Sequence, residues 1–325
     1  MKESTPVKAR RSPLFDSHMH TTLCRHAIGE PEEYARQAEA RGLSGIIVTC
    51  HSPMPDEWFR GVRMTPEELP DYFARVERAA TAFAGSVEVR LGMESDYFPG
   101  MENWLRELHG RAPFDYILGS VHYFGHEYMA RFHTGRDDDF LAAYFSNLCA
   151  SAESGLFDCL AHPDLIKNHF GDRWNFAAAE PLIAVALDRI ARTGVAMELN
   201  TSGMIKTIPE MNPGPRMLRM IAERKIPVVL GSDSHMPARV GDRFEEALSM
   251  LETAGFTACP CSRSGKRIDI PIKQARLRTQ GRAGGLEIRR TERADITRPA
   301  TPPRARCGRR AGPARPWPGR RCPGR

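Results

Sequence analysis

The sequence predicts an α/β fold, a seven-stranded (β/α) barrel whose chemistry lies at one end. First, short apolar runs alternate with helical segments seven times between residues 14 and 273, and such alternation predicts a parallel sheet covered by helices. Second, every run ends in polar side chains, where barrel enzymes carry their functional residues. An open doubly wound sheet is the alternative, but it would gather its polar residues at one switch point.

The strand ends carry the residues that indicate the chemistry. The run from Ile226 to Leu230 is followed by Asp233 and His235, which predicts a buried strand that ends in a tight turn. Side chains of these types are uncommon at such a position unless they bind a metal ion or exchange protons. The other six runs end, in chain order, in His18 with His20, His51, Glu94, His122, His162, and Glu198 with Asn200.

The segments between the strands predict helices, bounded by capping and breaking residues. Pro31 suits a first helical position, and Gly42 suits a left-handed C-terminal cap. Thr65 is a candidate N-cap, and Pro70 is expected to break or kink the helix that follows it. The predicted helices cover residues 31–41, 65–84, 101–109, 139–154, 181–192, 215–224 and 244–253.

Charge divides the chain into three parts. The net charge of the 325 residues is +6, but residues 274–325 hold 15 Arg and three acidic residues, whereas the rest holds 31 basic and 37 acidic residues. We expect a flexible N-terminus over 1–13, a single mildly acidic barrel domain over 14–273, and a disordered Arg/Pro/Gly-rich tail over 274–325. This balance argues against nucleic acid as a partner of the barrel. The tail is either a dispensable extension or a contact for a polyanion.

Two absent features bear on the location of the protein. No apolar run approaches the roughly 20 residues that a membrane span needs, and no apolar signal segment follows the basic residues 1–11. The eight cysteines are scattered and do not resemble a disulfide framework. We expect reduced thiols, a cytoplasmic location and no membrane partner. No pattern in the sequence predicts the oligomeric state.

Seven of the eleven histidines lie at strand ends or in the first loop. A lone strand-end histidine is more often a hydrogen-bonding residue, but seven at corresponding positions favour metal ions. One ion takes about four to six ligands, some of them water, so two or three divalent ions are expected, and imidazoles suit Zn, Mn or Fe. The nine candidate ligands are His18, His20, His26, His51, Glu94, His122, His162, Asp233 and His235. The remaining histidines, His109, His126, His133 and His169, lack this placement.

The ordered set of motifs resembles the PHP (polymerase and histidinol phosphatase) family over residues 14–273, and its histidinol-phosphatase branch in particular. The motifs are Asp16-Ser17-His18-Met19-His20, His26, Thr49-Cys50-His51, Gly92-Met93-Glu94, Gly119-Ser120-Val121-His122, His162-Pro163-Asp164-Leu165-Ile166-Lys167, Met197-Glu198-Leu199-Asn200-Thr201-Ser202-Gly203, Gly231-Ser232-Asp233-Ser234-His235 and Ile268-Asp269-Ile270-Pro271. One departure stands out: Cys50 takes a position that is often acidic in the family. An outer carboxylate that would support the third ion is therefore missing.

The resemblance implies a distorted barrel with a trinuclear site. By position, the first ion takes His18, His20, Glu94 and Asp233, the second shares Glu94 and adds His122 and His162, and the third takes His26, His51 and His235. It also implies a hydrolase that converts L-histidinol phosphate and water to L-histidinol and phosphate in histidine biosynthesis. A metal-bridging hydroxide would attack phosphorus in line, with Asp233, Glu94 and His235 as the catalytic residues.

The substrate contacts are less clearly marked. Lys167 and Arg239 are candidates for the phosphate, and Glu198, Asn200 and Asp164 for the amine and imidazole of the substrate. Three other functions stay open: a phosphoesterase of the same family with another small phosphorylated substrate, a nuclease that uses the basic tail, and a metal-binding scaffold without turnover.

Overall fold

Seven parallel strands form one sheet in a computed structural model that describes residues 11–55, 58–263 and 266–276. The strands are β1 (Ser12–Asp16), β2 (Leu43–Val48), β3 (Glu88–Asp96), β4 (Tyr116–Ser120), β5 (Cys159–Leu160), β6 (Ala196–Asn200) and β7 (Val228–Gly231). Each strand pairs with the next one along the chain. The predicted barrel is confirmed, and the open doubly wound sheet is excluded, because its strand order would reverse at a switch point.

The barrel is nearly closed, and its seam lies between β1 and β7. The backbone N–H of Ser17 donates to the carbonyl of Leu230 at 3.2 Å, and an isolated parallel bridge follows between Met19 and Ser234. The buried carboxylate of Asp16 accepts hydrogen bonds from the backbone N–H of Ser232 at 2.9 Å and of Gly241 at 2.7 Å. The two strands are therefore joined mainly by contacts beyond their carboxyl ends, where the candidate ligands also lie.

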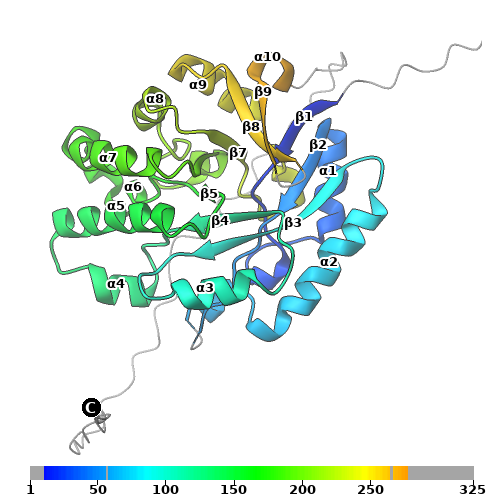
Figure 1. Cartoon of the computed structure of the whole chain (residues 1–325), viewed down its shortest axis with the longest axis horizontal. Helices are drawn as coiled ribbons and strands as arrows, with labels where there is room; N and C mark the ends of the chain where they lie inside the picture. The colour runs from blue at the N-terminus through cyan, green and yellow to red at the C-terminus, as the bar shows by residue number, and fades with distance from the viewer. Residues whose placement is uncertain (1–10, 56–57, 264–265, 277–325) are drawn as a thin grey trace, which may run out of the picture. The chain divides into compact units, whose positions relative to one another are not determined.

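Helices surround the strands, as Figure 1 shows. The main ones are α1 (Pro31–Ala40), α2 (Leu69–Ala82), α3 (Glu102–His109), α5 (Asp137–Glu153), α7 (Phe176–Ala191), α8 (Pro215–Glu223) and α9 (Phe244–Ala254). Buried aromatic side chains connect them to the strands. The hydroxyl of Tyr72 in α2, for example, lies 2.7 Å from the carbonyl oxygens of both Val48 and Gly92. No helix in the described part of the chain has the length and apolarity that a membrane crossing needs.

Two helices next to prolines begin at other residues than the prolines predict. Residues 65–84 form a 3-10 turn (Pro66–Glu68) followed by α2, so Pro70 lies in the first turn of the α-helix, where its missing N–H is tolerated. α7 begins at Phe176 rather than at Pro181, because the side chain of Asn175 caps the helix by accepting from the N–H of Ala178 at 3.3 Å.

The folded part includes elements that the sequence pattern did not predict. They are the helices α4 (His126–Phe132), α6 (Lys167–Phe170) and α10 (Ile272–Ala275) and the antiparallel hairpin β8 (Ala258–Arg263) and β9 (Lys266–Pro271). Ala275 is buried, and its carbonyl accepts from the hydroxyl of Ser12. Ser12 and Ala275 belong to the two ends predicted to be flexible or disordered. Residues 1–10 and 277–325, to which those predictions mainly apply, lie outside the described residues.

Candidate metal centre

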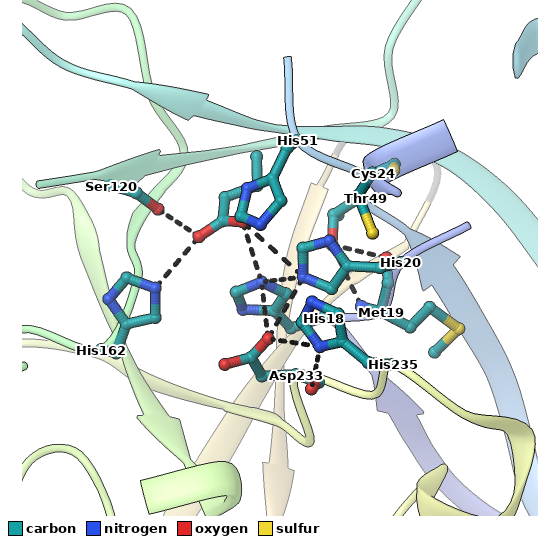
Figure 2. Close-up of polar contacts among 12 residues, drawn as sticks. His18, Met19, His20, Cys24, Thr49, His51, Ser120, His162, Asp233 and His235 are labelled. Atoms are coloured by element: carbon teal, nitrogen blue, oxygen red, sulfur yellow. Dashed lines mark hydrogen bonds and ion pairs between the residues drawn. The ribbon is translucent and has the colours of Figure 1, made fainter. Parts of the chain in front are cut away.

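All nine candidate ligands lie at the carboxyl end of the barrel. His18, His20 and His26 follow β1, Glu94 lies in β3, and the others follow β2, β4, β5 and β7. Figure 2 shows His18, His20 and His235 around Asp233, with Ser120 and His162 on the other side of the cluster. Ligands as far apart in the sequence as His18 and His235, 217 positions, thus lie in one cluster, because the parallel strands all end at the same rim of the barrel.

Four donor atoms form a group with the dimensions of a metal site. His18 Nε2 lies 3.2 Å from His20 Nε2 and 3.4 Å from Glu94 Oε2. Asp233 Oδ1 lies 3.1 Å from His20 Nε2 and 3.7 Å from His18 Nε2. A tetrahedral ion with bonds of about 2.0–2.1 Å holds its ligand atoms roughly 3.3–3.4 Å apart. These four atoms therefore fit the corners of one coordination shell.

The carboxylate of Glu94 links this group to a second one. Its Oε2 lies 2.7 Å from His51 Nδ1. Its Oε1 lies 3.0 Å from His162 Nε2 and 3.5 Å from His122 Nε2, and accepts from the hydroxyl of Ser120 at 2.5 Å. A carboxylate with imidazoles at both oxygens is placed to bridge two ions.

His26, His51 and His235 form a third group, whose ligand nitrogens all lie within 4.8 Å of one another. The ring of His235 stacks on that of His26 with centroids 4.4 Å apart. Several polar atoms in the whole cluster have no hydrogen-bond partner among the described residues, namely His20 Nδ1, His51 Nδ1, Glu94 Oε2, His162 Nδ1 and His235 Nε2. Two of these atoms, His51 Nδ1 and Glu94 Oε2, face each other at 2.7 Å. Buried imidazole nitrogens and carboxylate oxygens without a donor are suited to bind metal ions.

The cluster combines a carboxylate of low pKa with imidazoles whose pKa values are shifted in both directions. Burial raises the pKa of Glu94, but the imidazoles of His51, His18 and His122 outweigh burial and hold that pKa well below its usual range. Burial lowers the pKa of His51 to about 4. Burial lowers the pKa of His20, but its hydrogen bonds with Asp233 and Cys50 and the charges of Glu94 and Asp233 together outweigh burial and raise that pKa to about 9. An ion that binds His20 at neutral pH therefore displaces a proton.

Glu198 and Asn200, expected to contact the substrate, are fully buried behind the ligands. Glu198 Oε1 lies 2.8 Å from His18 Nδ1, and its Oε2 accepts from the Asn200 amide at 3.0 Å. Gly231 makes this approach feasible, because a Cβ there would lie 1.9 Å from Glu198 Oε1. Glu198 thus orients the ring of His18, as carboxylates behind metal-binding histidines do.

Lys167 and Arg239 are the two cations expected to hold phosphate, and each pairs with a carboxylate in the structure. Lys167 is completely buried, and its ammonium donates to Asp164 Oδ2 at 3.0 Å and to the Met211 carbonyl at 2.8 Å. This ammonium stabilises the loop after β5. Arg239 lies in a 3-10 turn, with its guanidinium 3.4 Å from Asp242.

Other residues near the ligands were not singled out from the sequence. Asp96 Oδ1 lies 2.6 Å from His122 Nδ1, and Arg63 binds its other oxygen at 2.6 Å. Asp96 follows Glu94 by two positions on β3. Residues two apart on a strand point to the same face, so the sequence alone could have placed Asp96 beside Glu94. Lys206 Nζ lies 3.2 Å from Asp233 Oδ2 and its side chain is 27% exposed, but nothing in the local pattern places it there.

Cys50 occupies a buried polar position beside the third group. Its sulfur accepts from the backbone N–H of Thr21 at 3.4 Å and from the Thr21 hydroxyl at 3.2 Å. The thiol takes the place of the expected carboxylate as an acceptor. Burial raises the pKa of this thiol, but its hydrogen bonds with Cys24 and His20 and the imidazoles of His20 and His51 outweigh burial and hold that pKa well below its usual range.

Known proteins resemble this chain in both sequence and fold. The model of the PHP domain family matches residues 16–202. A probable histidinol-phosphatase of Deinococcus radiodurans is 40% identical over 249 residues, which cover 74% of this chain and 94% of that protein. The histidinol-phosphatase of Bacillus subtilis is 25% identical, over 72% of this chain and 97% of that protein.

The solved structures include a histidinol phosphate phosphatase of Lactococcus lactis in complex with zinc, L-histidinol and phosphate. It aligns with a TM-score of 0.67 and 19% identity, over 78% of this chain and 98% of that chain. At this identity the match establishes a shared fold.

Removing a ligand from the first group is expected to lower the metal content of the purified protein. Asp233→Asn and His18→Ala each delete one corner of the four-atom group, so each should lose at least one tightly bound ion per chain in elemental analysis after dialysis. His109→Ala is the matched control, because its ring contacts Ser95 and Phe157 outside the group. Full metal content in both ligand variants would show that the assigned group binds no ion.

Proposed function

The chain belongs to the PHP family, and we propose that it is a histidinol-phosphatase, which hydrolyses L-histidinol phosphate to L-histidinol and phosphate. The observation that supports the chemistry is the set of three donor groups joined through Glu94. The substrate is supported by the 40% identity to the Deinococcus radiodurans protein over nearly its whole length. The enzyme is a phosphoric monoester hydrolase of histidine biosynthesis.

Three divalent ions, of zinc, manganese or iron, are proposed for the three groups. Under this assignment His18, His20, Glu94 and Asp233 hold the first ion, Glu94, His122 and His162 the second, and His26, His51 and His235 the third. When bound, such ions activate water near neutral pH, bind phosphoryl oxygens and stabilise the leaving alkoxide. The protein has to supply only positioning and charge.

The outer contacts supply the positioning. Glu198 fixes the ring of His18, and Asp96 fixes the ring of His122. Arg63 neutralises the charge of Asp96. Asp233 is held through its second oxygen by Lys206 and by the hydroxyl of Ser202 at 2.8 Å. These contacts support a rigid ligand set, which reduces the reorganisation needed during phosphoryl transfer.

Lys206 is our candidate for the cation that binds the substrate phosphate. Its ammonium contacts a proposed ligand and is partly exposed, whereas Lys167 and Arg63 are buried and paired with carboxylates. An ammonium at this place adds a positive charge beside the ions without entering their coordination shell. It is suited to bind a phosphoryl oxygen that the ions also contact.

Phosphate release from L-histidinol phosphate tests the function. Protein loaded with Mn or Zn should hydrolyse this ester far faster than p-nitrophenyl phosphate, and a chelator should abolish turnover until metal is restored. Similar slow rates on both esters would favour another small substrate. Cleavage of single-stranded DNA alone would favour a nuclease, and bound metal without any turnover a scaffold.

Lys206→Ala should lower kcat/KM for L-histidinol phosphate by about 10–100-fold, since a charge-assisted hydrogen bond contributes about 1.5–3 kcal/mol. Lys206→Arg should retain most of the activity, and the metal content of both variants should stay unchanged. Arg239→Ala, measured in parallel, tests the other remaining candidate. A larger loss in that variant than in Lys206→Ala would transfer the role to Arg239.

Deletion of residues 277–325 is expected to leave turnover of L-histidinol phosphate unchanged, because we propose that the barrel alone forms the site. The cut falls after α10, since Ile272 and Ala275 are buried in the barrel. The opposite outcome is a loss of salt-dependent DNA binding together with a fall in turnover of L-histidinol phosphate. That outcome would give the tail a functional role in binding a polyanion.

A further inference from the structure

Exposed apolar side chains follow the same strand ends as the ligands of the metal centre. Six large hydrophobic side chains are exposed in the described part of the chain, and four of them lie in the segments that follow strands. These four, Ile28, Phe124, Ile205 and Met236, are between 42% and 68% exposed, and we call them the apolar rim. The other two, Val185 and Ile268, lie on α7 and β9.

Each member of the apolar rim adjoins a residue of the centre. The N–H of Ile28 donates to the carbonyl of His235 at 2.9 Å, and Met236 is the next residue after His235. Ile205 precedes Lys206, which binds Asp233. The rim therefore has a fixed position with respect to the ligands, although single exposed apolar residues elsewhere need no explanation.

Phe124 is the aromatic member of the rim. Its ring lies 5.3 Å from that of His122, tilted by 49°, and the side chain is 57% exposed. His122 Nε2 in turn lies 3.5 Å from Glu94 Oε1. A largely exposed aromatic ring thus lies one side chain away from the proposed second ion site.

We propose that the apolar rim binds the organic part of the phosphoester, with Phe124 as the platform on which the imidazole ring of the substrate stacks. This inference rests on the proposed function and adds a residue that sets specificity. A planar heteroaromatic ring gains most from an offset or tilted contact with an aromatic side chain, and a protonated ring gains a cation–π contact as well. The ions and Lys206 bind the phosphate end, so the rim selects among esters by the group at the other end.

Steady-state kinetics of the metal-loaded, full-length protein test this proposal with two esters, L-histidinol phosphate and glycerol 3-phosphate, which has no ring. Phe124→Ala should raise KM for L-histidinol phosphate about 10-fold and leave kcat/KM for glycerol 3-phosphate unchanged. Phe124→Tyr should restore the wild-type KM. Val185→Ala, which removes an exposed apolar side chain on α7, is the matched control and should change neither.

The outcomes separate specificity from other roles of the rim. Equal losses on both esters in Phe124→Ala would mean that the ring only supports His122, and would overturn the proposal. The proposal would also be overturned if Phe124→Ala changed the kinetics of neither ester. It would be overturned as well if light scattering showed that Phe124→Ala dissociates a dimer while the preference for L-histidinol phosphate persists. A wild-type protein that does not prefer L-histidinol phosphate would refute the proposed function itself, and the stacking role would fall with it.

Discussion

The buried carboxylate of Glu94 is the feature on which the rest of the site depends. It is completely buried, and an uncompensated charge at such a place costs several kcal/mol. Imidazoles from β2, β4 and β5 meet its two oxygens, and His51 forms a parallel bridge with Glu94 in register. Strand pairing therefore fixes the carboxylate among its partners. The charge of this carboxylate is compensated by protonated imidazoles in the absence of ions, and bound cations would take over that compensation.

The backbone is shaped to bring the ligands this close together. His162 and Asp233 have φ values of 30° and 49°, in the left-handed region that side chains other than glycine rarely adopt. Such strain persists only where contacts hold it. The N–H of His162 is held by Glu198 at 2.9 Å, and the carboxylate of Asp233 by Lys206 and Ser202. The outer contacts thus stabilise the conformation as well as the orientation of the ligands.

The sequence predicts the features that depend on local periodicity. Seven apolar runs gave the strands and their order, because adjacent strands in this barrel are also successive in the chain. Histidines and acids directly after those runs gave the candidate ligands, since the rim of a parallel barrel is determined by its strand ends. The side chains of the three ligand groups meet at distances suited to metal ions. That each group binds one ion remains a proposal.

The features that the sequence did not predict depend on long-range packing. Lys167 and Arg63 are both cations in the sequence, yet each is buried: Lys167 donates to the distant Met211 carbonyl as well as to the nearby Asp164, and Arg63 pairs with Asp96 on β3. The role of Glu198 depends on Gly231 of the neighbouring strand, which leaves room for its side chain. Lys206 reaches Asp233 only because the loop after β6 turns over the barrel end. No residue-by-residue pattern encodes these contacts.

The three proposed ion sites differ in charge, and this difference sets their relative affinities. The first group contains two carboxylates, the second shares one of them, and the third contains only imidazoles. His26 of the third group is also exposed. Neutral ligands leave an ion with more of its positive charge and bind it less tightly. If ions bind as proposed, the third would therefore exchange most readily, and the departure at Cys50 lies beside the site with the lowest expected affinity.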